Sequence, residues 1–432
     1  MSAVKIYPSK LRGEVCIPSS KSMGHREIIC AGLAKGLSVV HNVSMSKDIA
    51  ATMRCLRALG VGIEELPDTA ARFSLRIRGV EKLQAVTAGA DCGESGSTLR
   101  FFIPLAATLN QPFTFTGGGK LVERPLQAYY DIFQEQGVSY ATENGGLPLR
   151  VQGRLHPGHY RLPGNVSSQY VTGLLLALPL LEGPSEIEIT TPLESSAYVD
   201  MTLSCLRKYG IKIENVDGDH RRYIVPGGQQ YQGREGAVEG DWSQAAFWLV
   251  AGCLGADITC KGLAYDSLQG DMVVMELLQS MGAVLEQMPQ GLKTLSHGTE
   301  GITIDASNCP DIIPIMTVLA AVSRGTTEII KAGRLRFKEC DRLQAISTEL
   351  RKLGADIEEK PEGLLVKGKP EGLKGGVEVD AWNDHRIAMS LAVASCACQE
   401  PVLLRGAESV QKSYPGFWQD FTDLGGKIEV KA

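Results

Sequence analysis

A single carboxylate among cations stands near the end of the chain, in the stretch Arg334-Leu335-Arg336-Phe337-Lys338-Glu339-Cys340-Asp341-Arg342. Glu339 has Lys338 beside it and an arginine three residues away on each side. If Glu339 opens a helix, Arg342 lies one turn further along, on the same face. Fixed cations can hold an anionic substrate while the carboxylate gives or takes a proton. A solvated, charged helix start is the alternative, and the other motifs of the chain decide between the two.

A second set of candidate ligands lies near the amino terminus, in Pro18-Ser19-Ser20-Lys21-Ser22-Met23-Gly24-His25-Arg26. Ser22 and the backbone N–H groups of a helix start can hold a phosphate or carboxylate, and Lys21 adds a point charge. Residues 92–100 form a small-residue turn into a helix, whose glycines allow a ligand to approach closely. Arg124 offers a further guanidinium. A plain capped helix, a tight turn and a surface arginine are the alternatives.

A glycine recurs six times directly before alternating apolar positions. The glycines are Gly60, Gly137, Gly210, Gly282, Gly354 and Gly425, which follow one another at nearly constant intervals. Glycine ends a helix without strain, and alternation with period two is typical of a strand. Each copy therefore predicts a helix end followed by a strand. Six copies at near-constant spacing indicate a repeated αβ unit of about 70 residues.

Small polar residues open an apolar helix with the same period. The marker positions are Ser22, Gly96, Ser168, Ser243, Asp311 and Arg386, again at nearly constant intervals. Each is an ordinary helix cap when taken alone. In register, each repeat brings one helix N-terminus, with its partial positive charge and free N–H groups, to an equivalent place. If the repeats cluster in threes, these ends can face a shared cleft that binds a multiply charged anion.

Six repeats divide naturally into two groups of three. We therefore expect an α/β (α+β) fold of two globular domains, each built from three αβ units, with helix N-termini converging on an interdomain cleft. The turn-rich stretch 226–239 is the expected crossing point. The first strand, before Pro18, precedes the first helix start and is assigned to the second half. The predicted domains are residues 1–20 plus 238–432, and residues 21–237.

The composition of the chain argues against several kinds of partner and cellular compartment. The net charge of the 432 residues is −5 and no basic patch stands out, which argues against nucleic acid. The longest apolar runs, at 174–181 and 245–254, are too short to span a bilayer, and residues 1–5 have no apolar signal core. The 11 cysteines are scattered, without a Cys-x-x-Cys motif, so we expect reduced thiols in a cytoplasm and no zinc site.

Together these stretches resemble, over the whole chain, the 5-enolpyruvylshikimate-3-phosphate synthase family of enolpyruvyl transferases. That family has two halves of three small αβ units, the number that the repeats predict. The motifs that carry the resemblance are Ser20-Lys21-Ser22…Arg26, Gly93…Gly96…Arg100, Glu123-Arg124-Pro125, Val166-Ser167-Ser168-Gln169-Tyr170, Ser195…Tyr198…Asp200, Gly240-Asp241-Trp242-Ser243, Pro310-Asp311, Arg336–Arg342 and Asn383-Asp384-His385-Arg386. The resemblance implies transfer of the enolpyruvyl group of phosphoenolpyruvate to the 5-hydroxyl of shikimate 3-phosphate, with release of phosphate, in the shikimate pathway to chorismate and the aromatic amino acids.

The resemblance also implies roles for individual residues. Shikimate 3-phosphate would be held by Lys21, Ser22, Arg26, Ser167, Ser168, Gln169, Ser195, Asp311, Arg334 and Lys338. Phosphoenolpyruvate would be held by Lys21, Gly96, Arg124, Gln169, Arg342, Arg386 and Lys412. Asp311 would take the proton of the attacking hydroxyl, Glu339 would carry the proton of the enolpyruvyl carbon, and Lys21 is a third catalytic candidate. The resemblance implies no metal, no cofactor and a monomer.

Two positions depart from the family pattern. Glu94 and Arg334 both stand where the family commonly has asparagine. Arg334 adds a cation near the phosphate of shikimate 3-phosphate and is compatible with binding. Glu94 places a carboxylate beside an anionic substrate, so we expect it to oppose phosphoenolpyruvate.

Two other functions remain as alternatives. The sister transferase that acts on UDP-N-acetylglucosamine uses a reactive cysteine in a mobile loop, and the corresponding region here, 114–126, has no cysteine. A non-catalytic anion- or nucleic-acid-binding repeat protein would suit the same architecture. The net charge of −5 and the carboxylates placed among the cations argue against it. We expect Asp241 to be a helix cap, and Asp341 and Asp384 to orient neighbouring arginines.

Overall fold

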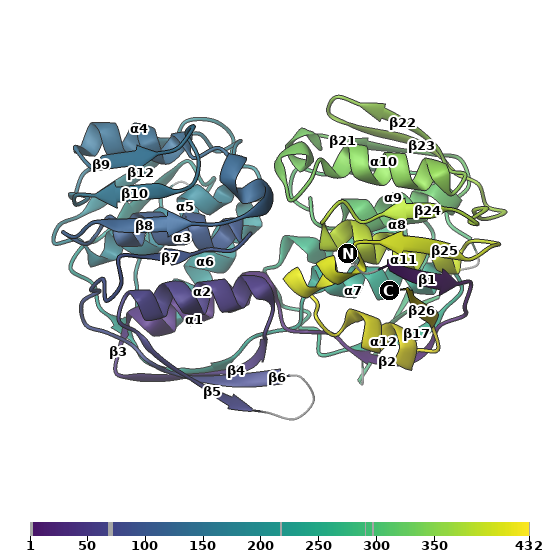
Figure 1. The fold of residues 1–432 in the computed structure, drawn as a ribbon, viewed down its shortest axis with the longest axis horizontal. Helices are drawn as coiled ribbons and strands as arrows, with labels where there is room; N and C mark the ends of the chain where they lie inside the picture. Colours follow the sequence, from purple (N-terminus) through teal and green to yellow (C-terminus); the bar gives the residue numbers. More distant parts are fainter. Residues whose placement is uncertain (1–2, 68–71, 217, 290, 296–297, 432) are drawn as a thin grey trace. The chain divides into compact units, whose positions relative to one another are not determined.

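The computed structural model describes residues 3–67, 72–216, 218–289, 291–295 and 298–431; Met1 and Ser2 of the chain start therefore lie outside the described residues. The chain separates into two compact units (Figure 1). Unit 1 comprises residues 1–18 and 239–432, and unit 2 comprises residues 19–238. The sequence places these two boundaries after residues 20 and 237.

Unit 2 alternates helices and short strands. Its helices are α1 (Lys21–Leu33), α2 (Lys47–Ala58), α3 (Gly96–Ala106), η1 (Gly119–Glu123), α4 (Gln127–Gln136), α5 (Ser168–Ala177), η2 (Leu178–Leu180) and α6 (Ser196–Lys208). Its strands are β3 (Ala34–Lys35), β4 (Leu37–Ser44), β5 (Gly62–Pro67), β6 (Arg72–Arg78), β7 (Gly89–Asp91), β8 (Phe113–Thr116), β9 (Ser139–Thr142), β10 (Leu149–Gln152), β11 (His159–Leu162), β12 (Ser185–Ile189), β13 (Glu214–Asn215), β14 (Arg222–Val225), β15 (Tyr231–Gln232) and β16 (Glu235–Ala237).

Unit 1 follows the same alternation. Its helices are α7 (Trp242–Cys253), η3 (Gly270–Val273), α8 (Val274–Ser280), α9 (Ile313–Val322), η4 (Gly333–Phe337), α10 (Arg342–Lys352), α11 (His385–Cys396), η5 (Ala407–Lys412) and α12 (Phe417–Asp423). Its strands are β1 (Ala3–Tyr7), β2 (Arg12–Cys16), β17 (Asp257–Lys261), β18 (Val284–Met288), β19 (Gly291–Leu295), β20 (Thr303–Asp305), β21 (Thr326–Ile330), β22 (Asp356–Lys360), β23 (Gly363–Lys367), β24 (Glu378–Asp380), β25 (Val402–Arg405) and β26 (Lys427–Lys431).

Six four-stranded sheets share one topology, three in each unit over the described residues. In the sheet β7-β8-β10-β9, an edge strand runs parallel to its neighbour and the other two contacts are antiparallel. One helix connects the two parallel strands and a second helix leads into the final hairpin. The same order appears in β11-β12-β14-β13 and in β20-β21-β23-β22. The predicted six αβ repeats are therefore confirmed.

Two strands, β2 and β16, each pair in one unit although the helix that follows them in the chain belongs to the other unit. Strand β2 directly precedes α1 of unit 2, but it pairs in parallel with β17 of unit 1. Strand β16 directly precedes α7 of unit 1, but it pairs in parallel with β4 of unit 2. Strand β1 lies between β25 and β26, and Figure 1 shows it in purple among the yellow strands of the carboxyl-terminal end. Unit 1 therefore needs the segment 1–18 to complete two of its sheets.

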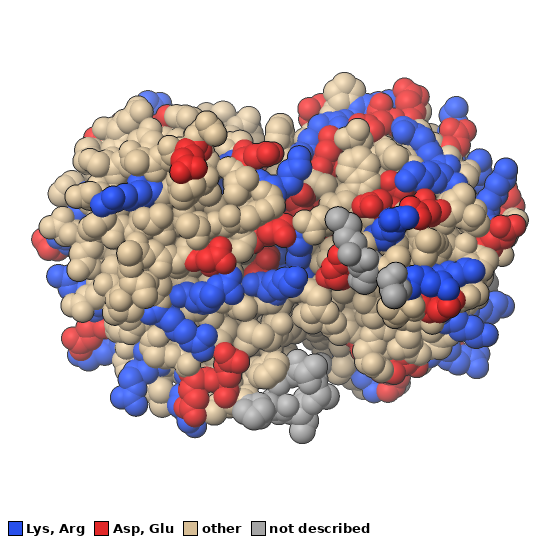
Figure 2. All heavy atoms as spheres, in the orientation of Figure 1, with Lys and Arg blue, Asp and Glu red and all other residues tan. Residues whose placement is uncertain are grey.

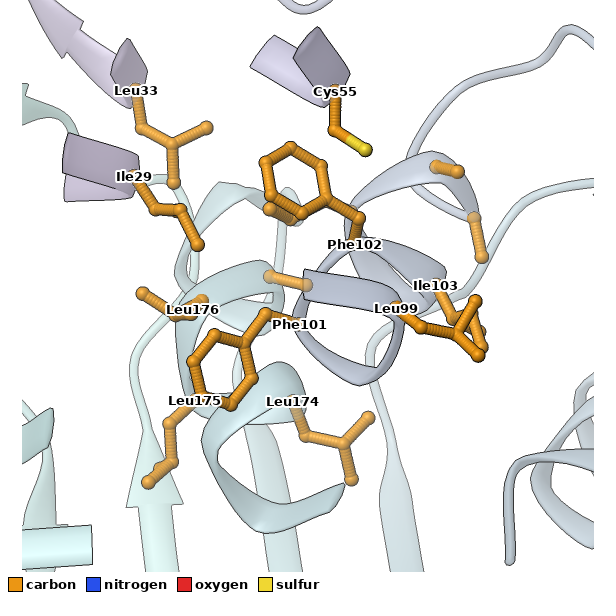
Figure 3. Packing of buried hydrophobic residues seen from close by; sticks show 14 of the residues in the cluster. Ile29, Leu33, Cys55, Leu99, Phe101, Phe102, Ile103, Leu174, Leu175 and Leu176 are labelled. Carbon is orange, nitrogen blue, oxygen red and sulfur yellow. The ribbon is translucent and has the colours of Figure 1, made fainter. Parts of the chain in front are cut away.

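The helices fall into two groups that differ in how much of their surface is buried. Helices α3, α5, α7, α9 and α11 are apolar on most sides, and these helices and the more polar α1 are buried along almost their whole length. Helices α2, α4, α6, α8, α10 and α12 alternate with them along the chain and bury one face only. Figure 3 shows Phe101 of α3 beside Leu174 and Leu175 of α5, whereas Phe102 points toward Cys55 of α2. The all-round apolar helices form the core of each unit.

All six repeated glycines end a helix. Their φ angles are 90° at Gly60, 68° at Gly137, 80° at Gly210, 92° at Gly282, 101° at Gly354 and 91° at Gly425. An L-residue with a side chain enters this region only with strain, so glycine is required at each stop. A strand follows each stop, as the alternating apolar positions predict.

The six predicted helix starts are also found, each within two residues of the first residue of α1, α3, α5, α7, α9 or α11. Five of the helices have an Asp or Ser side chain that caps their N-terminus, among them Asp241 and Asp384. The exception is α9, and Asp311, which lies just before it, binds two arginines. Among the described residues no helix is both long enough and apolar enough to cross a membrane.

Candidate active site

The guanidinium of Arg342 is the centre of a charged cluster in unit 1. Helix α10 begins at Arg342, and Asp341 caps it by accepting a hydrogen bond from the N–H of Gln344 at 3.0 Å. Glu339 therefore lies before the helix and does not open it, because Asp341 takes the capping position. The contact expected from a helix start at Glu339 still forms, since Nη2 of Arg342 lies 2.8 Å from Oε2 of Glu339.

Three carboxylates surround Arg342. Besides Glu339, Asp311 accepts from Nη1 and Asp384 accepts from Nε, each at 2.8 Å. The Arg342 side chain is 2% exposed. Burial alone would lower the pKa of Arg342, but Asp384, Glu339 and Asp311 outweigh it and raise that pKa well above the usual value. The positive charge is therefore permanent, and it holds Asp311 and Glu339 on neighbouring nitrogens of one planar group.

Asp311 also faces a second arginine. Nη2 of Arg386 lies 3.4 Å from Oδ2 of Asp311 and donates to the Ser243 hydroxyl at 2.7 Å. Burial would raise the pKa of Asp311, but Arg386, Lys338 and Arg342 together hold it well below the usual range. Asp311 is therefore an ionised hydrogen-bond acceptor at neutral pH.

Lys338 is an unusual cation. Burial, with Arg334 and Arg342 nearby, lowers its pKa to about 8, although Asp311 and Glu339 act in the opposite direction. Its ammonium group is therefore protonated at neutral pH and lies close to losing its charge. Arg334 is anchored by a 2.6 Å hydrogen bond from Nη2 to the carbonyl of Ser307. Lys338 is thus repelled by two nearby arginines, Arg334 and Arg342.

Lys412 reaches the same part of unit 1 from η5. It is 5% exposed, and its Nζ donates to the carbonyl of Asn383 at 2.6 Å. Asn383 directly precedes Asp384, the carboxylate that accepts from Nε of Arg342. Lys412 is therefore tied to the segment that also orients Arg342.

Arg336 is turned away from this cluster. Its Nη1 donates to Asp341 and to Glu359 at 2.8 Å each, and its other nitrogens donate to the carbonyls of Pro361 and Lys360. Arg336 is close to Glu339 in the sequence, but its contacts give it a structural role. Asp341 binds Arg336, a nearby arginine, as expected, whereas Asp384 binds Arg342, which is distant in the sequence, instead of the side chain of its neighbour Arg386.

In unit 2, Gly96 lies at a point where polar side chains converge. A Cβ atom on Gly96 would lie 2.6 Å from Nη1 of Arg124, 3.1 Å from Nη1 of Arg100 and 3.7 Å from Oε1 of Gln169. Gln169 accepts from Arg100 at 2.7 Å and donates to Ser97 at 2.9 Å. The starts of α3 and α5 and the segment after η1 therefore bring Gly96, Arg124 and Gln169 together.

Lys21 and the serines lie at helix starts of the same unit. Nζ of Lys21, the first residue of α1, lies 2.9 Å from Oδ2 of Asp48 in α2. Ser167 caps α5 by accepting from the N–H of Gln169 at 3.3 Å, and Ser168 is the first residue of that helix. Ser195 has a φ of 55° and directly precedes α6. These positions fit anion binding at helix N-termini.

Arg26, another of the predicted ligands, is buried between two helices of unit 2. It is 2% exposed, and its guanidinium donates to the hydroxyl of Thr202 at 2.8 Å and to the carbonyls of Ser22 at 2.6 Å and Tyr198 at 2.9 Å. Burial lowers its pKa to about 10. Arg26 therefore ties α1 to α6 at the end where Ser22 and Ser195 lie.

Glu94 lies against the segment that ends at Arg124. A Cβ atom on Gly119, the first residue of η1, would collide with the Glu94 carboxylate. Gly119 has a φ of 56°, a conformation that suits glycine. The side chain of Glu94 is thus packed on the backbone of η1, the short helix that leads to Arg124.

Several supporting residues were not predicted from the sequence. Asp48 pairs with Lys21, Thr202 holds Arg26, and Ser243 holds Arg386. Only Ser243 carried a signal, as one of the periodic helix-start markers. Among the described residues no three His, Cys, Asp or Glu side chains gather as a metal site would require. On the face shown in Figure 2, acidic and basic side chains are interspersed over each unit.

The chain was compared with known protein families and structures. The profile of the EPSP synthase (3-phosphoshikimate 1-carboxyvinyltransferase) family matches residues 6–421. The chain is 51% identical over 433 residues to a 3-phosphoshikimate 1-carboxyvinyltransferase of Clostridium novyi and 52% identical over 429 residues to one of Clostridium kluyveri, with 99% of each chain covered.

Solved structures agree with this match. EPSP synthase from Acinetobacter baumannii superimposes with a TM-score of 0.83 at 27% identity over 100% of both chains. The enolpyruvyl transferase NikO from Streptomyces tendae shares the fold, with a TM-score of 0.79 at 19% identity, over 100% of this chain and 98% of that one. The profile match over most of the chain and relatives about half identical over its whole length establish that this chain belongs to the EPSP synthase family.

Proposed function

We propose that this enzyme transfers the enolpyruvyl group of phosphoenolpyruvate to the 5-hydroxyl of shikimate 3-phosphate through the residues described above. The family and the names of its relatives support this activity, a step in aromatic amino-acid biosynthesis. The observation that carries the assignment is the pair of carboxylates Asp311 and Glu339, each 2.8 Å from Arg342. Proton-transfer groups held beside fixed cations are what an anionic enol substrate requires.

The cations bind and orient the substrates. Two phosphates and two carboxylates must approach one another, and their mutual repulsion has to be offset by positive groups. We assign Arg342, Arg386, Lys412, Arg124, Gln169, Gly96 and Lys21 to phosphoenolpyruvate. We assign Lys338, Arg334, Asp311, Ser22, Arg26, Ser167, Ser168, Gln169, Ser195 and Lys21 to shikimate 3-phosphate.

The reaction is an addition followed by an elimination. The 5-hydroxyl oxygen bonds to C2 of the enol, its proton passes to Asp311, and C3 receives a proton from Glu339. In the elimination C3 returns its proton to Glu339, the C2–C3 double bond forms again, and the bond from C2 to the phosphate oxygen breaks. The low pKa of Asp311 keeps it ionised but makes it a weak base, so it holds the hydroxyl proton only transiently and passes it to the departing phosphate. Lys21 is the further candidate for this proton transfer.

Arg342 links substrate binding to the proton-transfer groups. A guanidinium has five N–H donors, and here each of its three nitrogens donates to at least one of Asp384, Asp311 and Glu339. A substrate anion that binds Arg342 competes with Asp311 and Glu339 and leaves their oxygens available for protons. Asp384 keeps the guanidinium in place, because it also accepts from the N–H of Arg386 at 2.8 Å.

The assigned residues come from both units, so variants in either unit should impair the same reaction. We also propose that the enzyme works as a monomer in the cytoplasm, without a metal or cofactor. Equilibrium sedimentation of the purified enzyme, and activity after dialysis against a chelator, test the monomer and the metal independence. A stable dimer or a loss of turnover with the chelator would contradict these two parts of the proposal.

The test of function is release of inorganic phosphate from phosphoenolpyruvate. We expect release only when shikimate 3-phosphate is present, and none when UDP-N-acetylglucosamine replaces it. Release with UDP-N-acetylglucosamine alone would reverse the assignment in favour of the sister transferase. Arg386→Lys in unit 1 and Lys21→Met in unit 2 serve as paired variants. Both should lose at least about tenfold in kcat/KM, the effect of one lost charge-assisted hydrogen bond.

A further inference from the structure

Glu349 is a buried carboxylate outside the substrate-binding set. It lies in α10, two turns after Arg342, and is 1% exposed. Its Oε1 accepts from the indole Nε1 of Trp382 at 2.8 Å, and its Oε2 accepts from the N–H of Asp380 at 3.1 Å and from Nζ of Lys352 at 2.7 Å. Two of its three donors thus belong to the segment that runs from the end of β24 to α11.

That segment has a strained backbone. Trp382 and Asn383 are consecutive and both have a φ of 52°. The left-handed conformation costs a residue with a side chain about 1–2 kcal/mol, so other contacts must hold the turn. Glu349 holds it from one side, and the Asp380 side chain accepts from the N–H of Trp382 at 2.5 Å. The strained turn therefore persists only because of its hydrogen-bond partners, which include the Glu349 carboxylate on the neighbouring helix α10.

The turn positions three cations of the site. The carbonyl of Asn383 accepts from Lys412 at 2.6 Å, and the next residue, Asp384, accepts from Nε of Arg342 at 2.8 Å. Asp384 also caps α11, the helix that carries Arg386. A turn that relaxed would shift the carbonyl that holds Lys412 and the carboxylate that holds Arg342. Helix α10 secures this segment at two places, through Arg342 at its start and through Glu349 two turns later.

We propose that Glu349, acting through the indole N–H of Trp382, is a positioning residue that sets the phosphoenolpyruvate affinity of unit 1. The inference rests on the proposed function, because it takes Lys412, Arg342 and Arg386 as ligands of phosphoenolpyruvate. Glu349 does not touch substrate. It holds the left-handed turn so that these cations are in place before the substrate arrives, which lowers the cost of ordering them on binding.

The test uses Glu349→Gln and Trp382→Phe, separately and together. Glutamine places an amide N–H₂ where the N–H of Asp380 and the ammonium of Lys352 need an acceptor, and phenylalanine removes the indole donor while keeping one aromatic ring. We expect each single variant to raise the KM of phosphoenolpyruvate about tenfold, the lower end of the effect of losing a hydrogen bond to a charged group. The double variant should be no worse than the more impaired single variant, because both changes release the same turn.

A merely structural role predicts different results. It would lower the unfolding temperature while leaving both KM values unchanged, and general loosening would raise the KM of both substrates equally; either result would overturn the proposal. Lys352→Met is the matched control, since it removes the third partner of Glu349 without touching the turn, and it should leave the KM of phosphoenolpyruvate unchanged.

Lys412→Met separates this inference from the proposed function. If Lys412→Met leaves the KM of phosphoenolpyruvate unchanged, the substrate assignment of Lys412 has failed. If Lys412→Met raises it while Glu349→Gln and Trp382→Phe do not, the assignment stands and the inference about Glu349 is wrong.

Discussion

At the scale of single residues, one guanidinium organises the chemistry of unit 1. Arg342 draws carboxylates from three segments of the chain, before α9, before α10 and before α11. A buried ion cluster of this kind is costly to assemble and very costly to break on one side. Its value therefore lies in placing Asp311 and Glu339 rather than in stabilising the fold.

Glu339 is expected to be the carbon-directed acid and base. Glu339→Gln keeps the shape and the contact with Arg342 but cannot carry the proton, so kcat should fall by about 10² or more. Binding of shikimate 3-phosphate, measured by titration calorimetry, should survive. Glu359→Gln is the matched control, because Glu359 also binds an arginine of this stretch, Arg336 at 2.8 Å. A Glu339→Gln enzyme with near-normal kcat would move the role to Asp311 or Lys21.

Lys338 should make the kcat/KM of the reaction fall at alkaline pH. Its pKa of about 8 means that the ammonium charge is present below pH 8 and is lost as the pH rises through that value. The kcat/KM for shikimate 3-phosphate should therefore decline above about pH 8, since a cation that binds the substrate disappears. Lys338→Arg should move this decline to higher pH, whereas Lys352→Arg should not. An identical profile in Lys338→Arg would assign the decline to another group.

Glu94 is expected to weaken phosphoenolpyruvate binding. Its carboxylate lies on the backbone of η1, which leads to Arg124. A negative charge near an anionic substrate should cost about 1 kcal/mol, or about fivefold in affinity. Glu94→Asn should lower the KM of phosphoenolpyruvate by that factor and leave the KM of shikimate 3-phosphate nearly unchanged. A raised KM would instead mean that Glu94 supports the segment before Arg124.

At the scale of elements, the glycine stops are requirements of backbone geometry. Gly137 has a φ of 68°, and a Cβ atom there would meet nothing within 4 Å. Gly137→Ala should therefore destabilise the protein by about 1 kcal/mol through backbone strain alone. The measurement is the midpoint of urea unfolding, with kcat unchanged. Gly118→Ala is the control, because Gly118 also has open space but a φ of −138°. Equal midpoints for both variants would contradict this explanation.

At the scale of the whole molecule, the two units differ in their dependence on the rest of the chain. Every described sheet of unit 2 is made from residues within 19–238. Unit 1 takes β1 and β2 from the segment 1–18, and β1 lies in the interior of its sheet. The fragment 19–238 should therefore fold alone, with a cooperative transition in circular dichroism on heating. The fragment 239–432 should not.

A permuted fragment provides the control for this prediction. Ala3 and Lys431 are opposite each other on antiparallel β1 and β26, so a short hairpin loop can join residue 432 to residue 1. The chain 239–432 followed by 1–18 should recover a cooperative transition. Cooperative unfolding of 239–432 without β1 and β2 would show that the interior strand is dispensable.

The repeats, the helix stops and the helix starts could be predicted from the sequence because they depend on local rules. Glycine at a left-handed stop, Ser or Asp at a cap and the apolar period of helix and strand act within a few residues. The same rules identified the stretches that hold Lys21, Gly96, Ser168, Asp311 and Arg386. Their order along the chain carried the family resemblance.

Contacts between distant segments were decided only by the tertiary structure. Nothing local shows that Arg342 binds Asp384, far along the chain, or that Arg336 turns to Glu359 instead of toward Glu339. The exchange of β2 and β16 also depends on which sheet edge each strand meets after folding. Side-chain charge and the apolar period of the sequence determine whether a segment forms a helix or a strand and which groups it presents. The packing of the whole chain determines which other segment those groups contact.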